Sequence, residues 1–212
     1  MSAALRQTGV QYAYSVAALP PRVSEEEYEV ILEKSVEKLE FRNGQVVAMA
    51  GGGDTHSLAK GNLIGELKRA LKARPCRVYD SDMKVKIGPT GLNTFPDASI
   101  VCGKPQFKNE KRNTLLNPEA LFEVLSDGTE AYDRGDKFWN YRHLPSLTTY
   151  VLVSTKQPLV EVFELEDAVW QLSTFDGLEA SMTLKHHDLS IPLAAIYEKT
   201  DLDPSIAAED EG

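Results

Sequence analysis

Two carboxylates of the chain lie inside apolar segments, where an unpaired charge is costly. Asp97 follows Pro96 and opens the segment PDASIVC, and Glu123 lies within ALFEVLS. Burial of a carboxylate is unfavourable unless a partner offsets its charge, and a bound cation offsets two clustered charges at once. Mg²⁺ prefers oxygen ligands and keeps several waters. The pair therefore predicts a Mg²⁺ site, with Mn²⁺ as a substitute, suited to phosphodiester hydrolysis.

A lysine on the next helical segment completes the candidate site. Asp133, Lys137 and Tyr141 recur at four-residue spacing, so they share one face of a helix predicted over residues 129–143. This helix begins just after the strand that carries Glu123, near the strand end where sites in α/β sheets gather. Lys137 is therefore expected to stabilise charge on a phosphoryl group or to orient an attacking water.

Each of these residues also has a purely structural interpretation. Asp97 could cap a loop, and Glu123 could pair with a buried Lys or Arg. Lys137 could simply be the i, i+4 partner of Asp133, which could itself favour the helix N-terminus. Tyr141 could serve packing alone. The two interpretations differ in one respect, because the chemical one requires Asp97, Glu123 and Lys137 to meet in space.

Taken in order, these motifs resemble the Uma2 (DUF820) family of restriction-endonuclease-type proteins in the PD-(D/E)XK nuclease superfamily. The resemblance is carried by P-D at 96–97, E-V-L-S at 123–126 and D-x-x-x-K-x-x-x-Y at 133–141. It extends over residues 24–165, which is most of the chain. It implies a restriction-endonuclease-like core with a Mg²⁺-dependent site.

The resemblance also implies roles for single residues. Asp97 and Glu123 would be metal ligands. The superfamily signature places a lysine two residues after the second acid, but Leu125 occupies that position here. Lys137 would then act as a migrated lysine that reaches the site from the following helix.

Three further residues fit the resemblance. Glu40, in LEFRNGQVVAM, would complete the acidic cluster as a third metal ligand. His56 would be a general base, a phosphate contact or a helix-capping residue. Asp82, in YDSDMKVKI, also fits the family pattern.

The elements that must position these residues predict an α/β fold. We expect a mixed central β-sheet flanked by helices, with the segments around Asp97 and Glu123 as its middle strands and additional antiparallel strands near the C-terminus. A capping box at Ser24 and Glu27 predicts a helix to Lys34. The other predicted elements are a hairpin over 38–49, a helix over 55–73 capped by Asp54 or Thr55, one alternating strand over 77–87, and an antiparallel meander of TTYVLV, LVEVFE and AVWQLST.

Length and charge suggest one domain with acidic ends. The 212 residues suffice for one well-buried core, and we expect an irregular leader at 1–23, a nuclease-like domain at 24–198 and an acidic tail at 199–212. The net charge of −9 argues against a nucleic-acid partner, but the acidic excess lies at the ends. The stretches 60–77 and 104–112 lean basic, as phosphate contacts or as solvated surfaces.

Cysteine usage and hydropathy favour a cytoplasmic protein. Cys76 and Cys102 lack metal-ligand spacing and are interpreted as buried free thiols in a reducing compartment. No apolar run approaches the length of a membrane span, and no signal peptide is recognised at the N-terminus. The adjacent pair His186 and His187 lacks helical ligand spacing and is interpreted as surface residues.

These observations predict a Mg²⁺-dependent endonuclease that acts on DNA as a homodimer, with no membrane partner. The dimer is inferred from the need to cut both strands of a duplex; the late strands and the leader are the expected interface. The alternative is a catalytically inactive nuclease fold that binds nucleic acid or protein, which Leu125 and the acidic balance favour. Hydrolysis of a small phosphodiester is a third interpretation.

Overall fold

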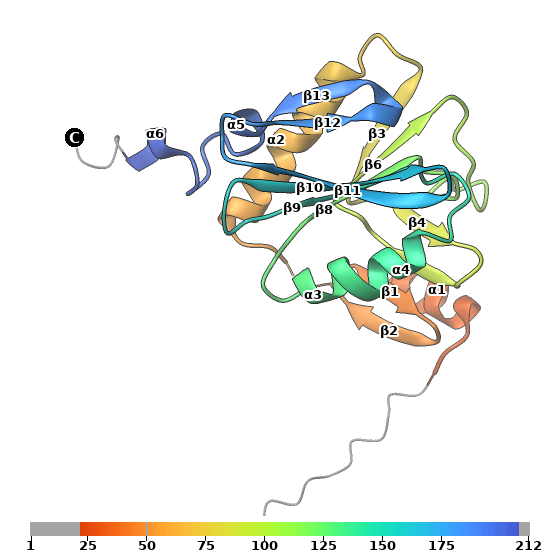
Figure 1. Ribbon diagram of the computed structural model, residues 1–212. Coiled ribbons are helices and arrows are strands. Elements are labelled where there is room, and N and C mark those ends of the chain that lie inside the picture. Colours follow the sequence, from red (N-terminus) through yellow and green to blue (C-terminus); the bar gives the residue numbers. More distant parts are fainter. Residues whose placement is uncertain (1–21, 50, 208–212) are drawn as a thin grey trace, which may run out of the picture.

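A six-stranded sheet forms the centre of the fold in the computed structural model, which describes residues 22–49 and 51–207 (Figure 1). The strand order is β11-β10-β9-β8-β6-β3. Only β8 and β9 pair in parallel; the other neighbours are antiparallel. The strands span Cys76–Asp80 (β3), Ala98–Cys102 (β6), Ala120–Val124 (β8), Thr149–Val153 (β9), Leu159–Glu166 (β10) and Val169–Asp176 (β11).

Two smaller sheets pack against the central one. The five-stranded sheet has the order β2-β1-β5-β4-β7, and the third sheet is the hairpin β12-β13. Their strands span Leu39–Arg42 (β1), Gln45–Ala48 (β2), Lys84–Ile87 (β4), Leu92–Thr94 (β5), Thr114–Leu115 (β7), Ser181–Leu184 (β12) and Leu189–Pro192 (β13). In Figure 1 the β1–β2 hairpin lies below the central sheet and β12–β13 lies above it.

Helices flank both sides of the central sheet. The long helix α2 accompanies β12–β13 above the sheet, whereas α1, α3 and α4 lie below it (Figure 1). The helices span Glu25–Lys34 (α1), Asp54–Ala70 (α2), Glu130–Tyr132 (α3), Phe138–Tyr141 (α4), Leu193–Ile196 (α5) and Pro204–Ala207 (α6). A π-helical turn, η1 (Asp133–Lys137), joins α3 to α4, and a 3₁₀ turn, η2 (Lys185–His187), precedes β13.

The alternation of side chains along β8 creates two cores. Phe122 and Val124 face α2 and the β12–β13 hairpin, where one hydrophobic cluster lies. Leu121 and Leu125 face the opposite side and join the cluster that contains Tyr141. Because successive strand residues alternate between faces, Glu123 points to the second side, toward the five-stranded sheet and α4.

Most of the predicted architecture is confirmed. The mixed sheet flanked by helices is present, β6 and β8 are interior strands, and β9-β10-β11 form the expected antiparallel meander. The capping box of Ser24 and Glu27 is formed at α1, and β1 and β2 pair as a hairpin. Residues 1–21 of the predicted leader (1–23) and residues 208–212 of the predicted tail (199–212) lie outside the described residues.

Two local predictions were wrong. The single strand expected over 77–87 is divided into β3 and β4, which belong to different sheets, because a turn at Ser81 and Asp82 redirects the chain. The N-cap of α2 is Gly53 rather than Asp54 or Thr55, and no side chain caps that helix. Alternation alone does not reveal where a strand leaves one sheet for another.

The cysteine prediction is also corrected. Cys76 and Cys102 form a disulfide, because the antiparallel register of β3 and β6 places them directly opposite each other. Opposed residues of an antiparallel pair project from the same face, and this pairing is invisible in the sequence. His187, expected at the surface, is 5% exposed, whereas His186 is exposed as predicted.

Candidate active site

Asp97 and Glu123 meet at one end of the central sheet. The register of β6 and β8 pairs Ala98 with Phe122, so Asp97, one step before β6, lies opposite Glu123. Directly opposed residues point to the same face. The backbone N–H of Val124 donates to Asp97 Oδ2 at 2.9 Å. Both carboxylates line one cavity of about 470 Å³, as the chemical interpretation of the sequence requires.

Lys137 reaches this cluster from the π-helical turn η1. Its Nζ lies 2.9 Å from Glu123 Oε1, 3.1 Å from Asp133 Oδ1 and 3.7 Å from Glu40 Oε1. The side chain is almost fully buried. The predicted i, i+4 pair with Asp133 is therefore formed, and the same ammonium also contacts Glu123. Single π-turns within helices occur frequently at functional sites.

Tyr141 contributes more than packing. Its hydroxyl donates to Glu123 Oε1 at 2.8 Å, while its ring packs edge-on against Tyr150 in the core. Glu123 Oε1 thus accepts from Tyr141 and from Lys137. The four-residue spacing identified in the sequence places all three helix residues on the face that meets β8.

Glu40 lies in the cluster, but both of its oxygens already have partners. Oε1 accepts from the Thr94 hydroxyl, and Oε2 accepts from Arg42 Nε at 2.8 Å. The Arg42 guanidinium in turn stacks over the Tyr132 ring, 3.5 Å from its centroid. Sequence reasoning missed Thr94, Arg42 and Tyr132. Arg42 carried a usable signal, because residues two apart in a strand share a face.

The first turns of α2 supply a second set of contacts to Asp97. His56 Nε2 lies 3.4 Å from Asp97 Oδ2, and Lys60 Nζ lies 3.7 Å from Oδ1. His56 and Lys60 are four residues apart and therefore share a helix face. His56 does not cap the helix, since Gly53 occupies the N-cap. Lys60 was noted only as part of a basic stretch; its spacing from His56 was the signal that could have singled it out.

Asp82 is not brought to the cluster. It lies in the turn between β3 and β4, its side chain is 84% exposed, and it pairs with Lys38 at 2.7 Å. It does not line the cavity that contains Asp97 and Glu123. Asp82 thus forms no ion pair with Asp97, Glu123 or Lys137 among the described residues, although its partner Lys38 lines the cavity.

The environment gives the two opposed acids different proton affinities. Burial by itself would raise the pKa of Asp97, but His56, the Val124 N–H and Lys60 outweigh burial and lower it. Burial raises the pKa of Glu123 well above its usual value; Asp133 and Asp97 add to this effect, and Lys137 opposes it. Asp97 is thus held as a carboxylate, whereas Glu123 holds its proton more tightly than an exposed glutamate.

Lys137 remains charged despite its burial. Desolvation alone would lower the pKa of this lysine, but the carboxyl groups of Glu123, Asp133 and Glu40 raise it above the usual value. One fully buried ammonium therefore faces three buried acids, and Asp97 stands beside them. Carboxylate oxygens in excess over buried cations form a donor set that suits a hard divalent ion.

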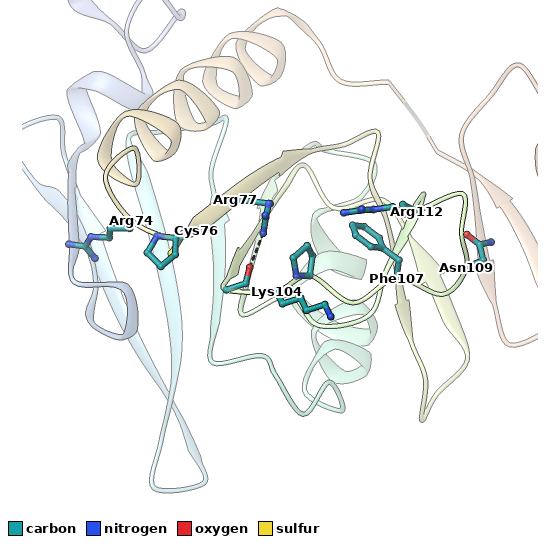
Figure 2. Close-up of a pocket in the computed structure, with 10 residues that line it drawn as sticks. Arg74, Cys76, Arg77, Lys104, Phe107, Asn109 and Arg112 are labelled. Atoms are coloured by element: carbon teal, nitrogen blue, oxygen red, sulfur yellow. Dashed lines mark hydrogen bonds between the residues drawn. The ribbon is translucent and has the colours of Figure 1, made fainter.

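The two basic stretches of the sequence meet at a different place. Arg77 from the first stretch and Lys104 and Arg112 from the second line a surface cavity of about 840 Å³ (Figure 2). Figure 2 shows Arg112 stacked over Phe107, with the guanidinium 4.7 Å from the ring centroid. Two other lysines of the second stretch, Lys108 and Lys111, are instead paired with glutamates of α1.

The fold, together with the acidic cluster around Lys137, is that of an α/β protein of the nuclease type. The sequence matches the Uma2 family, "Putative restriction endonuclease", over residues 25–194. The chain therefore belongs to the Uma2 family.

The chain is also similar to two proteins of Synechocystis and to a solved structure. An uncharacterized protein of Synechocystis sp., slr1290, is 35% identical over 186 residues, which cover 87% of this chain and 96% of that protein. A second uncharacterized Synechocystis protein, sll1609, is 28% identical over 151 residues, covering 71% and 85%. The crystal structure of "a putative nuclease belonging to DUF820" from Anabaena variabilis has a TM-score of 0.66 at 16% identity and covers 81% of this chain and 96% of that one. The last similarity concerns the fold.

Proposed function

We propose that the chain is a Mg²⁺-dependent endonuclease that hydrolyses phosphodiester bonds in DNA at the cleft lined by Asp97, Glu123 and Lys137. The observation that carries the proposal is the opposition of Asp97 and Glu123 on one face of β6 and β8, with Lys137 Nζ 2.9 Å from Glu123. Membership of the Uma2 family supports a nuclease. The finer assignment to Mg²⁺ rests on the carboxylate donors, and the assignment to DNA rests on the family description.

Asp97 and Glu123 are the proposed ligands of the cation. Both offer carboxylate oxygens to the same cavity, and oxygen ligands suit Mg²⁺ or Mn²⁺. The oxygens of Glu40 are engaged by Thr94 and Arg42, so we assign Glu40 to charge pairing with Arg42 and Lys137 rather than to direct ligation. When bound, the ion polarises a phosphoryl oxygen and lowers the pKa of water.

The chain's own residues bind and orient the phosphodiester. Lys137 presents a fixed positive charge where negative charge develops on the phosphoryl group, and a preorganised charge of this kind needs no rearrangement during the reaction. Lys60 lies beside Asp97 in the same cavity and is only partly buried, so it can meet an incoming phosphate. His56 and the Val124 N–H hold Asp97 Oδ2 in place.

Two sites related by a two-fold axis can act on the two strands of a duplex together, and we therefore include a homodimer in the proposal. The predicted interface consists of the leader and the strands β9, β10 and β11, of which the edge strand β11 exposes Val169 and Leu172, at 59% and 52%. Sedimentation analysis of the full chain, with and without a DNA duplex, tests the dimer. A species that sediments as a monomer under both conditions would remove this part of the proposal.

Cleavage assays with isosteric variants test the proposed function. Supercoiled and linear DNA are incubated with the wild-type chain, Asp97→Asn and Glu123→Gln, in Mg²⁺, in Mn²⁺ or in a chelator. We expect metal-dependent cleavage by the wild-type chain and a loss of at least about 100-fold in each variant, as is usual when a major transition-state contact is removed. Asp82→Asn is the matched control, because Asp82 lies outside the cavity, and it should cleave normally.

The same assay separates the rival functions. Cleavage that survives both substitutions would exclude this site. DNA retention without cleavage, independent of metal, would identify a binding module on a nuclease fold. Hydrolysis of a small phosphodiester, with no action on DNA, would identify a small-substrate hydrolase that uses the same cleft.

A further inference from the structure

A buried histidine without hydrogen bonds lies on the other face of the central sheet. His187 ends the 3₁₀ turn η2 and is 5% exposed. Neither ring nitrogen has a hydrogen-bond partner within residues 22–49 and 51–207. Buried polar groups almost always have such a partner. A neutral imidazole offers the lone pair of one ring nitrogen to a metal ion.

Other metal-ligating groups surround this ring. Cys102 Sγ, a carboxylate oxygen of Glu119 and a ring nitrogen of His187 all lie within 4.8 Å of one another. Glu119 Oε1 accepts the Cys102 N–H at 3.1 Å, which holds the carboxylate beside the strand. Cys76 is bonded to Cys102 and projects from the same face. Two sulfurs, one nitrogen and one oxygen thus converge from four segments of the chain.

The redox state of the cysteines decides whether these donors can bind an ion. A thiolate is a strong metal ligand, whereas a sulfur in a disulfide is not. A dithiol reductant transfers two electrons, cleaves the Cys76–Cys102 bond to two thiols and itself becomes a disulfide. A metal ion that binds both sulfurs then displaces the two thiol protons.

We propose that, with the Cys76–Cys102 bond reduced, Cys76, Cys102, Glu119 and His187 form a structural Zn²⁺ site. Zinc favours four-coordinate sets of thiolate, imidazole and carboxylate; bonds of about 2.0–2.3 Å place tetrahedral donors roughly 3.5 Å apart. The donors of Cys102, Glu119 and His187, now within 4.8 Å of one another, reach that spacing by side-chain movements on the order of 1 Å. Mixed sulfur and nitrogen donors favour zinc over magnesium.

This site is separate from the candidate active site. Cys102 ends β6, whereas Asp97 precedes it, and the intervening strand corresponds to about 16 Å. Cys76 and Cys102 pack with the cluster on the α2 side of the sheet, whereas Glu123 points to the opposite side. The zinc site can therefore fail without affecting the proposed function, and the reverse also holds.

Cobalt spectroscopy of the full chain tests the proposal. The chain is reduced with a phosphine under anaerobic conditions, freed of reductant and titrated with Co²⁺. We expect one ion per chain, with a thiolate-to-cobalt charge-transfer band that Zn²⁺ abolishes, and no such band in the oxidised chain. His187→Ala should weaken cobalt binding at least tenfold, whereas the neighbouring control His186→Ala and the active-site variant Glu123→Gln should bind normally.

A measurement on the wild-type chain keeps the test independent of variant folding. Zn²⁺ should protect both thiols of the reduced protein from alkylation by a maleimide, with one zinc retained per chain in native mass spectrometry. The proposal is overturned if the reduced chain shows no thiolate band, if Zn²⁺ does not protect the thiols, or if a folded His187→Ala variant binds Co²⁺ with unchanged affinity.

Discussion

At the scale of single residues, the candidate site is defined by one buried ammonium among several acids. Lys137 lies within 4 Å of Glu123, Asp133 and Glu40, so its charge makes their burial tolerable. The structural and chemical interpretations of this lysine are therefore compatible. The residue that neutralises the acidic cluster is also the residue proposed to meet a phosphoryl group.

Lys137→Ala should strongly destabilise the metal-free protein. Removing one partner of a buried ion pair leaves the other charge uncompensated, which typically costs about 3–5 kcal/mol. Thermal unfolding in a chelator should show a large fall in melting temperature, and added Mg²⁺ should raise that temperature more in the variant than in the wild-type chain. Lys156→Ala is the control. The Lys156 side chain is 59% exposed where it pairs with Asp127 and Glu130, so this substitution should change the melting temperature little. Equal stability of both variants would contradict this account.

Glu123 should make metal binding depend on pH. Burial raises its pKa, so without metal the folded protein holds this proton more tightly than the unfolded chain does. The stability contributed by that proton is present below the unfolded pKa and is lost as pH rises through the folded pKa. A cation requires the carboxylate, so metal affinity should rise with pH, and binding should release a proton. Asp97, with a lowered pKa, should release none.

Calorimetric titration with Mn²⁺ in two buffers of different ionisation enthalpy measures the released proton. Glu123→Gln should abolish the release, and Asp82→Asn should preserve it. An affinity that does not change with pH would show that Glu123 is already ionised in the folded protein, against its buried environment.

At the scale of elements, the start of α2 depends on a glycine that the sequence marks only as a strand breaker. A Cβ built on Gly52 would lie 2.2 Å from the His56 ring, whereas one on Gly51 would meet nothing within 4 Å. The His56 ring therefore occupies the space that the missing side chain leaves. The close approach of this segment to the helix keeps His56 beside Asp97.

Gly52→Ala should displace His56 and loosen Asp97. A contact of 2.2 Å cannot persist, so the ring must move, and one hydrogen-bonding partner of Asp97 is lost. We expect the chain to stay folded and phosphodiester cleavage to fall about tenfold, equivalent to about 1.4 kcal/mol of transition-state stabilisation. Gly51→Ala is the matched control. Cleavage rates together with the NMR chemical shifts of the His56 ring distinguish displacement of the ring from a general loss of structure, and unchanged values in Gly52→Ala would contradict the prediction.

At the scale of the whole molecule, charge is distributed so that a net acidic chain retains a cationic surface. Glutamates of α1 pair with Lys84, Lys86 and Lys108, which removes those lysines from any phosphate contact. Lys104 forms no ion pair with the residues that the structure describes and lines the basic cavity of Figure 2.

Among the residues that the structure describes, no helix combines the length and apolarity needed to span a bilayer.

Lys104→Ala should weaken DNA binding in a way that depends on salt. Each phosphate contact adds about 0.9 to the slope of log affinity against log salt concentration on duplex DNA. We therefore expect the slope to fall by about 1 with little change in sequence preference. Fluorescence anisotropy at several salt concentrations measures the slope. Lys111→Ala is the control, because Lys111 is already paired with Glu33. An unchanged slope would place this cavity outside the DNA-binding surface.

The sequence alone determined the fold class and the core of the candidate site. Apolar runs identified the interior strands, and four-residue spacing identified the helical segment that carries Lys137, because local spacing fixes which face a residue occupies. Buried acids in apolar segments indicated the chemistry, because isolated charges are costly there. These inferences needed only neighbours along the chain.

Strand register and packing between elements were decided by the tertiary structure. The Cys76–Cys102 bond depends on the pairing of β3 with β6, and the convergence of Glu119 and His187 depends on how η2 packs against that pair. The engagement of Glu40 by Thr94 likewise depends on β1 lying beside β5. Each is a contact between segments far apart in the chain, and no spacing within a single segment specifies it.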